Sequence, residues 1–444
     1  MKVLLVLALA LLFTNPCVFA ALPIHRNPSD TANLELPVVD TPFNFIGGGL
    51  NFPSMRQSLA LSSSFYEVSH RAILGERENR EWWKYLVVGG FDAFTGYLPL
   101  GNAWLHEEWH RSVMSRRNIH SYNDVYNLPI GQNIIAVSHV NDIDLVNLKA
   151  NHPAEQVRLS SAGMESQVAQ NLYIQKNQFF RESAANNIVL FWMNNLSVSG
   201  YLSLCGSSSA DASTSEQNSE DGVNIQKRDF TGLDCTAWVY DLFRPDEPYG
   251  LRGGHPSGVG IDRYITYSDL TEREKDFLAK QTTLSYLNFF DPFLFGIDSL
   301  HSELIGESFD WNAKLSHALT SFGYVVNMHF FLRTEFQKFL FEVHHGFSPS
   351  GYFPGATFAW EEARLSDKWD LTPSLTLWNQ PAQQRFDHKN ASAMVSGGLR
   401  FAYKFLPSWK SYLSLLAKTD GWQTGEDSID RSLSITAGIQ GSVF

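Results

Sequence analysis

The chain has little basic character. Lys and Arg total 34 against 46 Asp and Glu, which gives a formal net charge of −12 over 444 residues. A surface that binds nucleic-acid phosphates needs clustered positive charge. The sequence contains no basic stripe and no recognised nucleic-acid module, so nucleic acid is not an expected partner. G-x-S-x-G, P-loop and Rossmann patterns are also missing, and with them the signatures of several large enzyme classes.

Long apolar runs are scarce, and the clearest one lies at the N-terminus. Lys2 precedes the apolar segment 3–13, and small residues follow up to Ala20. This order is typical of a secretory signal peptide, so residues 1–20 are predicted to be removed by cleavage near Ala20. The apolar run is too short for a good membrane-spanning helix. The chain is therefore expected to be exported.

Cysteine is rare as well, with three in the whole chain. Loss of the signal peptide would remove Cys17 and leave Cys205 and Cys235. An exported protein can join such a pair in one disulfide bond, and two unpaired cysteines are the alternative. The segment 205–235 is rich in Ser, Asp and Glu, which predicts a solvated, flexible loop.

What the sequence does contain is His106-Glu107-Glu108-Trp109-His110. In a helix, His106 and His110 stand at i and i+4, so their imidazoles can converge on one ion. Glu107 would lie beside that ion and could take a proton from a bound water molecule. These five residues resemble the H-E-x-x-H motif of the zincin metallopeptidases. The resemblance implies a Zn2+ ion, a peptide or protein substrate, and Glu107 as general base; the alternative is a solvated polar helix face.

The third metal ligand is not fixed by the motif. The metzincin pattern needs His at position 116, where this chain has Arg116. The gluzincin pattern takes a Glu from a later helix, and Glu165 in a predicted helix over 161–181 is the candidate. It shares an apolar helix face, where a carboxylate needs a compensating cation. Asp124, His120 and His139 stay open as alternative ligands.

After about residue 313, the apolar period changes from 3.6 to 2. Leu433, Ile435 and Ile439 alternate with small and polar residues near the C-terminus, as in a β-strand with one apolar face. The repeated strands, turns and aromatic residues resemble a bacterial outer-membrane β-barrel, and 132 residues suffice for about eight strands. Phe444 shares its face with Ser442 instead of the apolar residues, so a soluble sheet or sandwich is the alternative.

The predicted fold class is α+β, with a helical metallopeptidase-like domain before an antiparallel β-meander. The predicted divisions are a signal peptide at 1–20, an N-terminal extension at 21–70, a helical domain at 71–312 and a β-rich domain at 313–444. The expected function is that of an exported zinc peptidase of the cell envelope, with an outer-membrane location favoured over a periplasmic or secreted one. The alternative is a non-enzymatic outer-membrane pore or scaffold.

Overall fold

The computed structural model describes residues 31–41, 44–45, 53–76, 80–127, 135–181, 186–304 and 307–443. The predicted signal peptide and Phe444 lie outside these residues. The described helices are α2 (Met55–Leu74), α3 (Trp82–Thr95), α4 (Asn102–Arg116), α5 (Asp142–Asn151), α6 (Pro153–Arg181), α7 (Ile188–Cys205), α8 (Ser209–Asp221), α9 (Asp234–Phe243) and α10 (Glu272–Ser285). Helices precede most of the strands along the chain, so the α+β class is confirmed.

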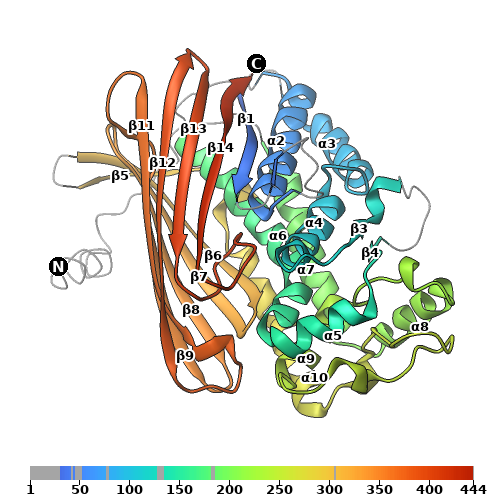
Figure 1. The fold of residues 1–444 in the computed structure, drawn as a ribbon. Coiled ribbons are helices and arrows are strands. Elements are labelled where there is room, and N and C mark those ends of the chain that lie inside the picture. Colours follow the sequence, from blue (N-terminus) through green and yellow to red (C-terminus); the bar gives the residue numbers. More distant parts are fainter. Residues whose placement is uncertain are drawn as a thin grey trace.

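One antiparallel sheet holds nearly all of the described strands (Figure 1). Its path runs β2-β1-β14-β13-β12-β11-β9-β8-β7-β6-β5, and β10 pairs with β11 beside this path. The short strands β3 (Tyr122–Asn123) and β4 (Val137–Ser138) pair with each other elsewhere. The strands of the large sheet are β1 (Ala32–Thr41), β2 (Asn44–Phe45), β5 (Leu300–Leu304), β6 (Glu307–Thr320), β7 (Gly323–Arg333), β8 (Lys338–Ser348), β9 (Gly351–Trp360), β10 (Ala363–Arg364), β11 (Trp369–Pro381), β12 (Ala391–Leu406), β13 (Trp409–Lys418) and β14 (Ser432–Val443).

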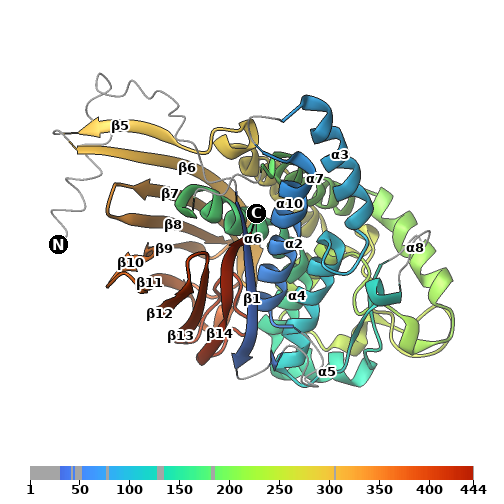
Figure 2. The ribbon, with the colours of Figure 1, turned by 90° about the horizontal axis from the view of Figure 1, so that it is seen from above.

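The prediction of an eight-stranded barrel within 313–444 is wrong for the described residues. The sheet is open, and it recruits β1 from the N-terminal extension and β5 and β6 from before residue 313. Helices stand where a barrel wall would close. α2 packs on β1 near one edge, α6 packs on β6 near the other, and α2 and α6 pack on each other. Figure 2 shows the sheet as an arc with α6 on its concave side.

The segment from Trp82 to Arg116 forms two helices, α3 and α4, and α3 is largely exposed on one face. α6 begins at Pro153, eight residues before the predicted start at Ser161. Proline is well suited to the first turn of a helix because it has no backbone N–H to leave unpaired. Within the predicted loop 205–235, residues 209–221 form helix α8.

The segment between β13 and β14 ties the sheet to the helices. Asp427 Oδ1 accepts the backbone N–H of Met55 at the start of α2 (2.9 Å). Arg56 bonds Glu426 from the same segment (2.6 Å), and Arg117 at the end of α4 bonds Asp430 (2.7 Å). Burial raises the pKa of Asp427 to about 7, with Arg56 opposing the rise and Asp40 adding to it.

We expect Asp427→Asn to remove a pH dependence of stability. A carboxyl with pKa 3.8 when exposed and about 7 when folded loses stabilising proton binding as pH rises from about 4 to about 7, and the penalty stays constant above that. The asparagine keeps an acceptor for Met55 without the charge. The free energy of unfolding can be measured by chemical denaturation at pH 5 and pH 8. At pH 8, the value for Asp427→Asn should exceed that of the unaltered protein by about 2–4 kcal/mol.

Asp430→Asn is the matched control, because that carboxylate lies in the same segment with its side chain 55% exposed. Its free energy of unfolding should change by less than about 1 kcal/mol at both pH values. An unaltered pH slope in Asp427→Asn would contradict the assignment.

Candidate metal centre

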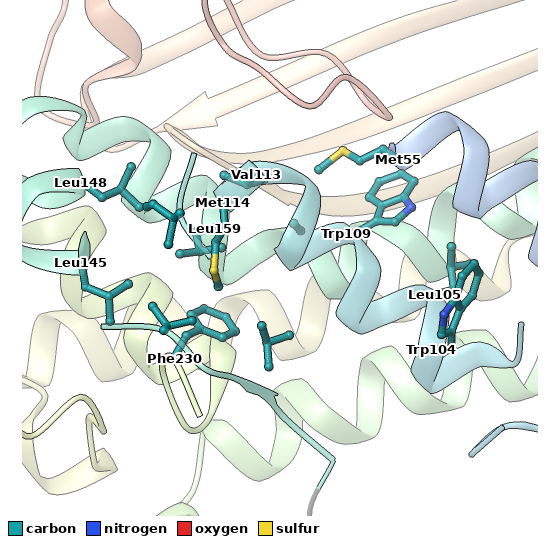
Figure 3. Packing of buried hydrophobic residues seen from close by; sticks show 14 of the residues in the cluster. Met55, Trp104, Leu105, Trp109, Val113, Met114, Leu145, Leu148, Leu159 and Phe230 are labelled. Atoms are coloured by element: carbon teal, nitrogen blue, oxygen red, sulfur yellow. The ribbon is translucent and has the colours of Figure 1, made fainter. Parts of the chain in front are cut away.

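Helix α4 carries the H-E-x-x-H motif on a firmly packed base. Its apolar residues are all buried: Trp104, Leu105, Trp109, Val113 and Met114. Figure 3 shows them in one cluster with Met55, Leu159 and Phe230. Gly101, not Asn102, occupies the position before the helix. Packing on several neighbouring elements leaves α4 little freedom to rotate.

Glu108, the second glutamate of the motif, has a structural role. Its carboxylate is fully buried and accepts hydrogen bonds from Arg111 (2.5 Å) and Asn123 (2.9 Å). Asn123 in turn belongs to the small β3–β4 sheet. Glu108 therefore anchors α4 to that sheet and faces away from solvent.

His106 and His110 meet a third residue that sequence reasoning missed. Asp234 Oδ2 lies 2.9 Å from His106 Nε2 and 3.2 Å from His110 Nε2. The three side chains offer ligand atoms that all lie within 4.8 Å of one another. Two nitrogens and one oxygen on a tetrahedral zinc ion would be separated by roughly 3.3 Å, so this spacing suits one small cation.

The orientation of His110 strengthens the case for a cation. Its Nδ1 lies 2.6 Å from the carbonyl oxygen of Leu159, and a carbonyl can only accept a hydrogen bond. Nδ1 therefore carries a proton, and in a neutral ring the unprotonated Nε2 lies 3.2 Å from the Asp234 carboxylate oxygen. His110 Nε2 is buried without a hydrogen bond. A nitrogen and a carboxylate oxygen this close repel each other unless a proton or a metal ion lies between them.

Asp234 owes its position to several contacts. It is the first residue of α9, its backbone N–H donates to the Tyr201 hydroxyl (3.0 Å), and the next residue forms the Cys205–Cys235 disulfide with the end of α7. The disulfide alternative is thereby confirmed over two unpaired cysteines. Burial alone would raise the pKa of Asp234, but His110 and His106 lower it to about 2.

Gly163 on α6 leaves the room that the two imidazoles occupy. A Cβ atom at this position would lie 2.2 Å from His106 Nε2 and 2.4 Å from His110 Nε2. Both distances are far below van der Waals contact. The helix backbone therefore forms one wall of the group, and only glycine permits this approach.

Glu107 lies beside the group and is partly buried. Burial raises its pKa well above the ordinary value. The nearby charge of His106 opposes that rise, and the carboxylates of Asp229, Asp234 and Asp124 add to it. The Glu107 carboxylate makes no hydrogen bond with another side chain or backbone group in the described part of the chain, so it is available to a substrate or a water molecule.

The structure does not bring Glu165 to the histidine pair. Its carboxylate is fully buried, accepts two hydrogen bonds from Arg158 (3.0 and 3.3 Å) and one from the backbone N–H of Gly425 (3.0 Å). The expected compensating cation is thus a guanidinium seven residues earlier on the same helix. The sequence analysis correctly predicted a cation beside the Glu165 carboxylate, but it expected a metal ion and not an arginine side chain.

The alternative ligands also lie outside the group. Asp124 Oδ1 accepts from the Ser138 hydroxyl (2.8 Å). His139 has its Nδ1 2.8 Å from that same hydroxyl oxygen. His120 is exposed, with Nδ1 3.3 Å from the carbonyl oxygen of His139. No short-range spacing links Asp234 to the motif, so the sequence offered no signal for it except its position next to Cys235.

We expect Gly163→Ala to destabilise the folded chain by about 1–3 kcal/mol, because the new methyl group overlaps the imidazoles of His106 and His110. Gly200→Ala on α7 is the matched control. A Cβ there would meet nothing within 4 Å, and its free energy of unfolding should rise slightly or stay unchanged. Equal stabilities of the two variants, measured by denaturant unfolding, would show that α6 does not constrain the imidazoles.

Comparison of the chain with protein-family models, with curated proteins and with solved structures found no match.

Proposed function

We propose that this protein is a metal-dependent hydrolase that cleaves peptide bonds, with Zn2+ as the preferred ion. The observation that carries the proposal is the convergence of His106, His110 and Asp234 on one point, with Glu107 beside it. Two imidazoles and one carboxylate are a common ligand set of catalytic zinc sites, which keep the fourth position open. In this arrangement Asp234 takes the place that sequence analysis gave to Glu165.

The chain's own residues would divide the work as follows. His106, His110 and Asp234 hold the cation, which when bound lowers the pKa of water and polarises a carbonyl group. Glu107 accepts the proton of the attacking water and passes it to the leaving amine. The Tyr201 ring lies 6.2 Å from the His106 ring. Its hydroxyl already accepts the Asp234 N–H, so its own proton can be donated to the developing oxyanion.

The alternative of a non-enzymatic pore receives less support. The described sheet is open, and helix α6 occupies its concave side (Figure 2). Ion pairs such as Arg400–Glu35 (2.9 Å) cross the same space. Among the described residues, this space is therefore occupied in part by a helix and by paired charged side chains.

Metal analysis tests the ligand set. Purified protein should contain one zinc per chain by mass spectrometry. His106→Ala and Asp234→Ala should lose it, whereas His120→Ala, an exposed histidine outside the group, should keep it. Glu165→Gln should also keep it while lowering stability by about 3–5 kcal/mol, because Arg158 becomes an uncompensated buried charge. Zinc retained by folded Asp234→Ala but lost from folded Glu165→Gln would restore Glu165 as the ligand.

Activity tests the role of Glu107. With a library of fluorogenic peptides, Glu107→Gln should lower kcat by about 10²- to 10⁴-fold while zinc content stays at one per chain. The substitution preserves size and removes only the ability to accept a proton. Full activity in this variant would rule out Glu107 as general base, and absence of activity in the zinc-loaded unaltered protein would rule out a peptidase.

A further inference from the structure

The large sheet exposes apolar side chains on its outward face and buries polar side chains on its inward face. Along β14, the inward Ser434, Thr436 and Gln440 are buried, whereas Leu433 and Ile435 are exposed on the other face. The same alternation continues across the register: Leu399 on β12 pairs with Leu415 on β13, which pairs with Ile435. A soluble sheet that covers a core with one face has the opposite pattern.

The outer face carries almost no charge. On β7, β8, β9, β11, β12, β13 and β14, no Asp, Glu, Lys or Arg stands in the outward phase of the described strands. Leu377, Leu413 and Leu433 are 53%, 43% and 64% exposed. Monomeric soluble proteins rarely expose apolar patches beyond a few hundred Å². The outward residues include Phe309, Trp311, Ala313, Val326, Met328, Phe330, Phe341, Val343, Ala356, Phe358, Leu371, Leu375, Leu377, Val395, Leu399, Phe401, Leu413, Leu415, Leu433, Ile435 and Ile439.

The inner face carries the charged residues of the sheet, beside buried apolar ones such as Phe331, Leu340 and Trp378. Arg333 bonds Asp310 (2.8 Å), and Arg181 bonds Glu362 (3.3 Å). A cavity of about 220 Å³ on this side is lined largely by charged and polar residues, including Glu35, Arg181, Glu362 and Arg400. The charges are thus sorted to the inside, where they pair with one another.

Aromatic residues border the apolar face at both strand ends. Tyr324, Phe347 and Tyr352 are register neighbours at one end of β7, β8 and β9. Trp360 stands at the other end of β9. Tyr352 and Trp360 are eight positions apart, about 27 Å along the strand at ~3.4 Å per residue. This matches the apolar band of ~25 Å that lies between the aromatic girdles of membrane sheets. Trp369 and Tyr403, paired neighbours on β11 and β12, extend the second border.

Helices with exposed apolar residues connect the two ends of the sheet. β6 contacts the short helix η7 (Pro292–Phe295), which contacts α7; α7 contacts α3, α3 contacts α2, and α2 contacts β1. Trp82, Leu86 and Phe94 form an exposed stripe on α3. α7 has the length and composition of a membrane-spanning helix, with 44% of it buried. These helices and the sheet form a ring around α6, which we call the outer ring.

We propose that the outer ring contacts the hydrocarbon chains of a lipid bilayer. The scarcity of charge on the convex face is unfavourable in water and matches hydrocarbon. A second copy of the chain could cover only part of a convex arc of this extent, whereas fluid lipid can follow all of it. At the two ends of the described sheet, α2 contacts β1, next to the edge strand β2, and η7 contacts β6, next to the edge strand β5.

Fluorescence quenching in vesicles tests this contact. Single cysteines are introduced at Leu377, Leu413 and Asp367 in a Cys17→Ser chain, labelled with an environment-sensitive dye, and reconstituted in phosphatidylcholine. Asp367 is the control, because it lies in the turn before β11 with its side chain 94% exposed. Lipids that carry a nitroxide on the acyl chain should quench the first two labels several-fold more strongly than the third.

Equal quenching at the three positions would overturn the proposal. So would a chain that stays in detergent-free buffer as a monodisperse monomer, or as a dimer that shields both leucine positions. A second pair of variants guards against label effects: Leu413→Lys should lower the yield of folded protein in vesicles several-fold, and Leu413→Phe should not. Zinc content is independent of these readouts, so the bilayer contact and the proposed peptidase can fail separately.

Discussion

The structure depends on hydrogen bonds to the buried polar side chains of α6. This 29-residue helix is buried for most of its length, and many of its buried residues are polar. Gln170 bonds Ser62 on α2 (2.9 Å), and Asn171 bonds Asn195 on α7 (3.0 Å). Buried polar groups must find partners, so the elements around α6 turn polar faces inward and leave apolar faces outside.

The same helix also builds the candidate metal centre. Gly163 lets α6 approach the imidazoles, and the carbonyl of Leu159 sets the tautomer of His110. Arg158, one position before Leu159, neutralises Glu165 and bonds the carbonyl oxygen of Glu426 (2.7 Å). The start of α6 therefore links the proposed metal ligands to the segment between β13 and β14. The ligand geometry is rigid because these neighbours are buried and charge-paired.

The disulfide completes the centre from the other side. Cys205 at the end of α7 and Cys235 at the start of α9 are 30 residues apart in sequence, with Cα atoms 6.0 Å apart. This covalent bond fixes the start of α9, where Asp234 stands between the two histidines. An exported chain can maintain such a bond, which agrees with the predicted signal peptide. The centre thus combines a local motif on α4 with a third residue held by a remote cross-link.

The sequence by itself determined the local features. The spacing of His106 and His110 was sufficient to predict that their imidazoles converge on one side of a helix. The period-2 pattern was sufficient to predict the strands near the C-terminus, since the alternation of faces is a property of each strand alone. Only the tertiary structure decided which residues meet across the chain. Asp234 contacts the histidines although it lies 124 positions beyond His110. Glu165 pairs with Arg158 and not with the metal ion that the sequence analysis predicted. Strand β1 pairs with β14 from the opposite end of the sequence. Such contacts depend on how the elements pack on one another, and packing between distant segments produces no repeating pattern in the sequence.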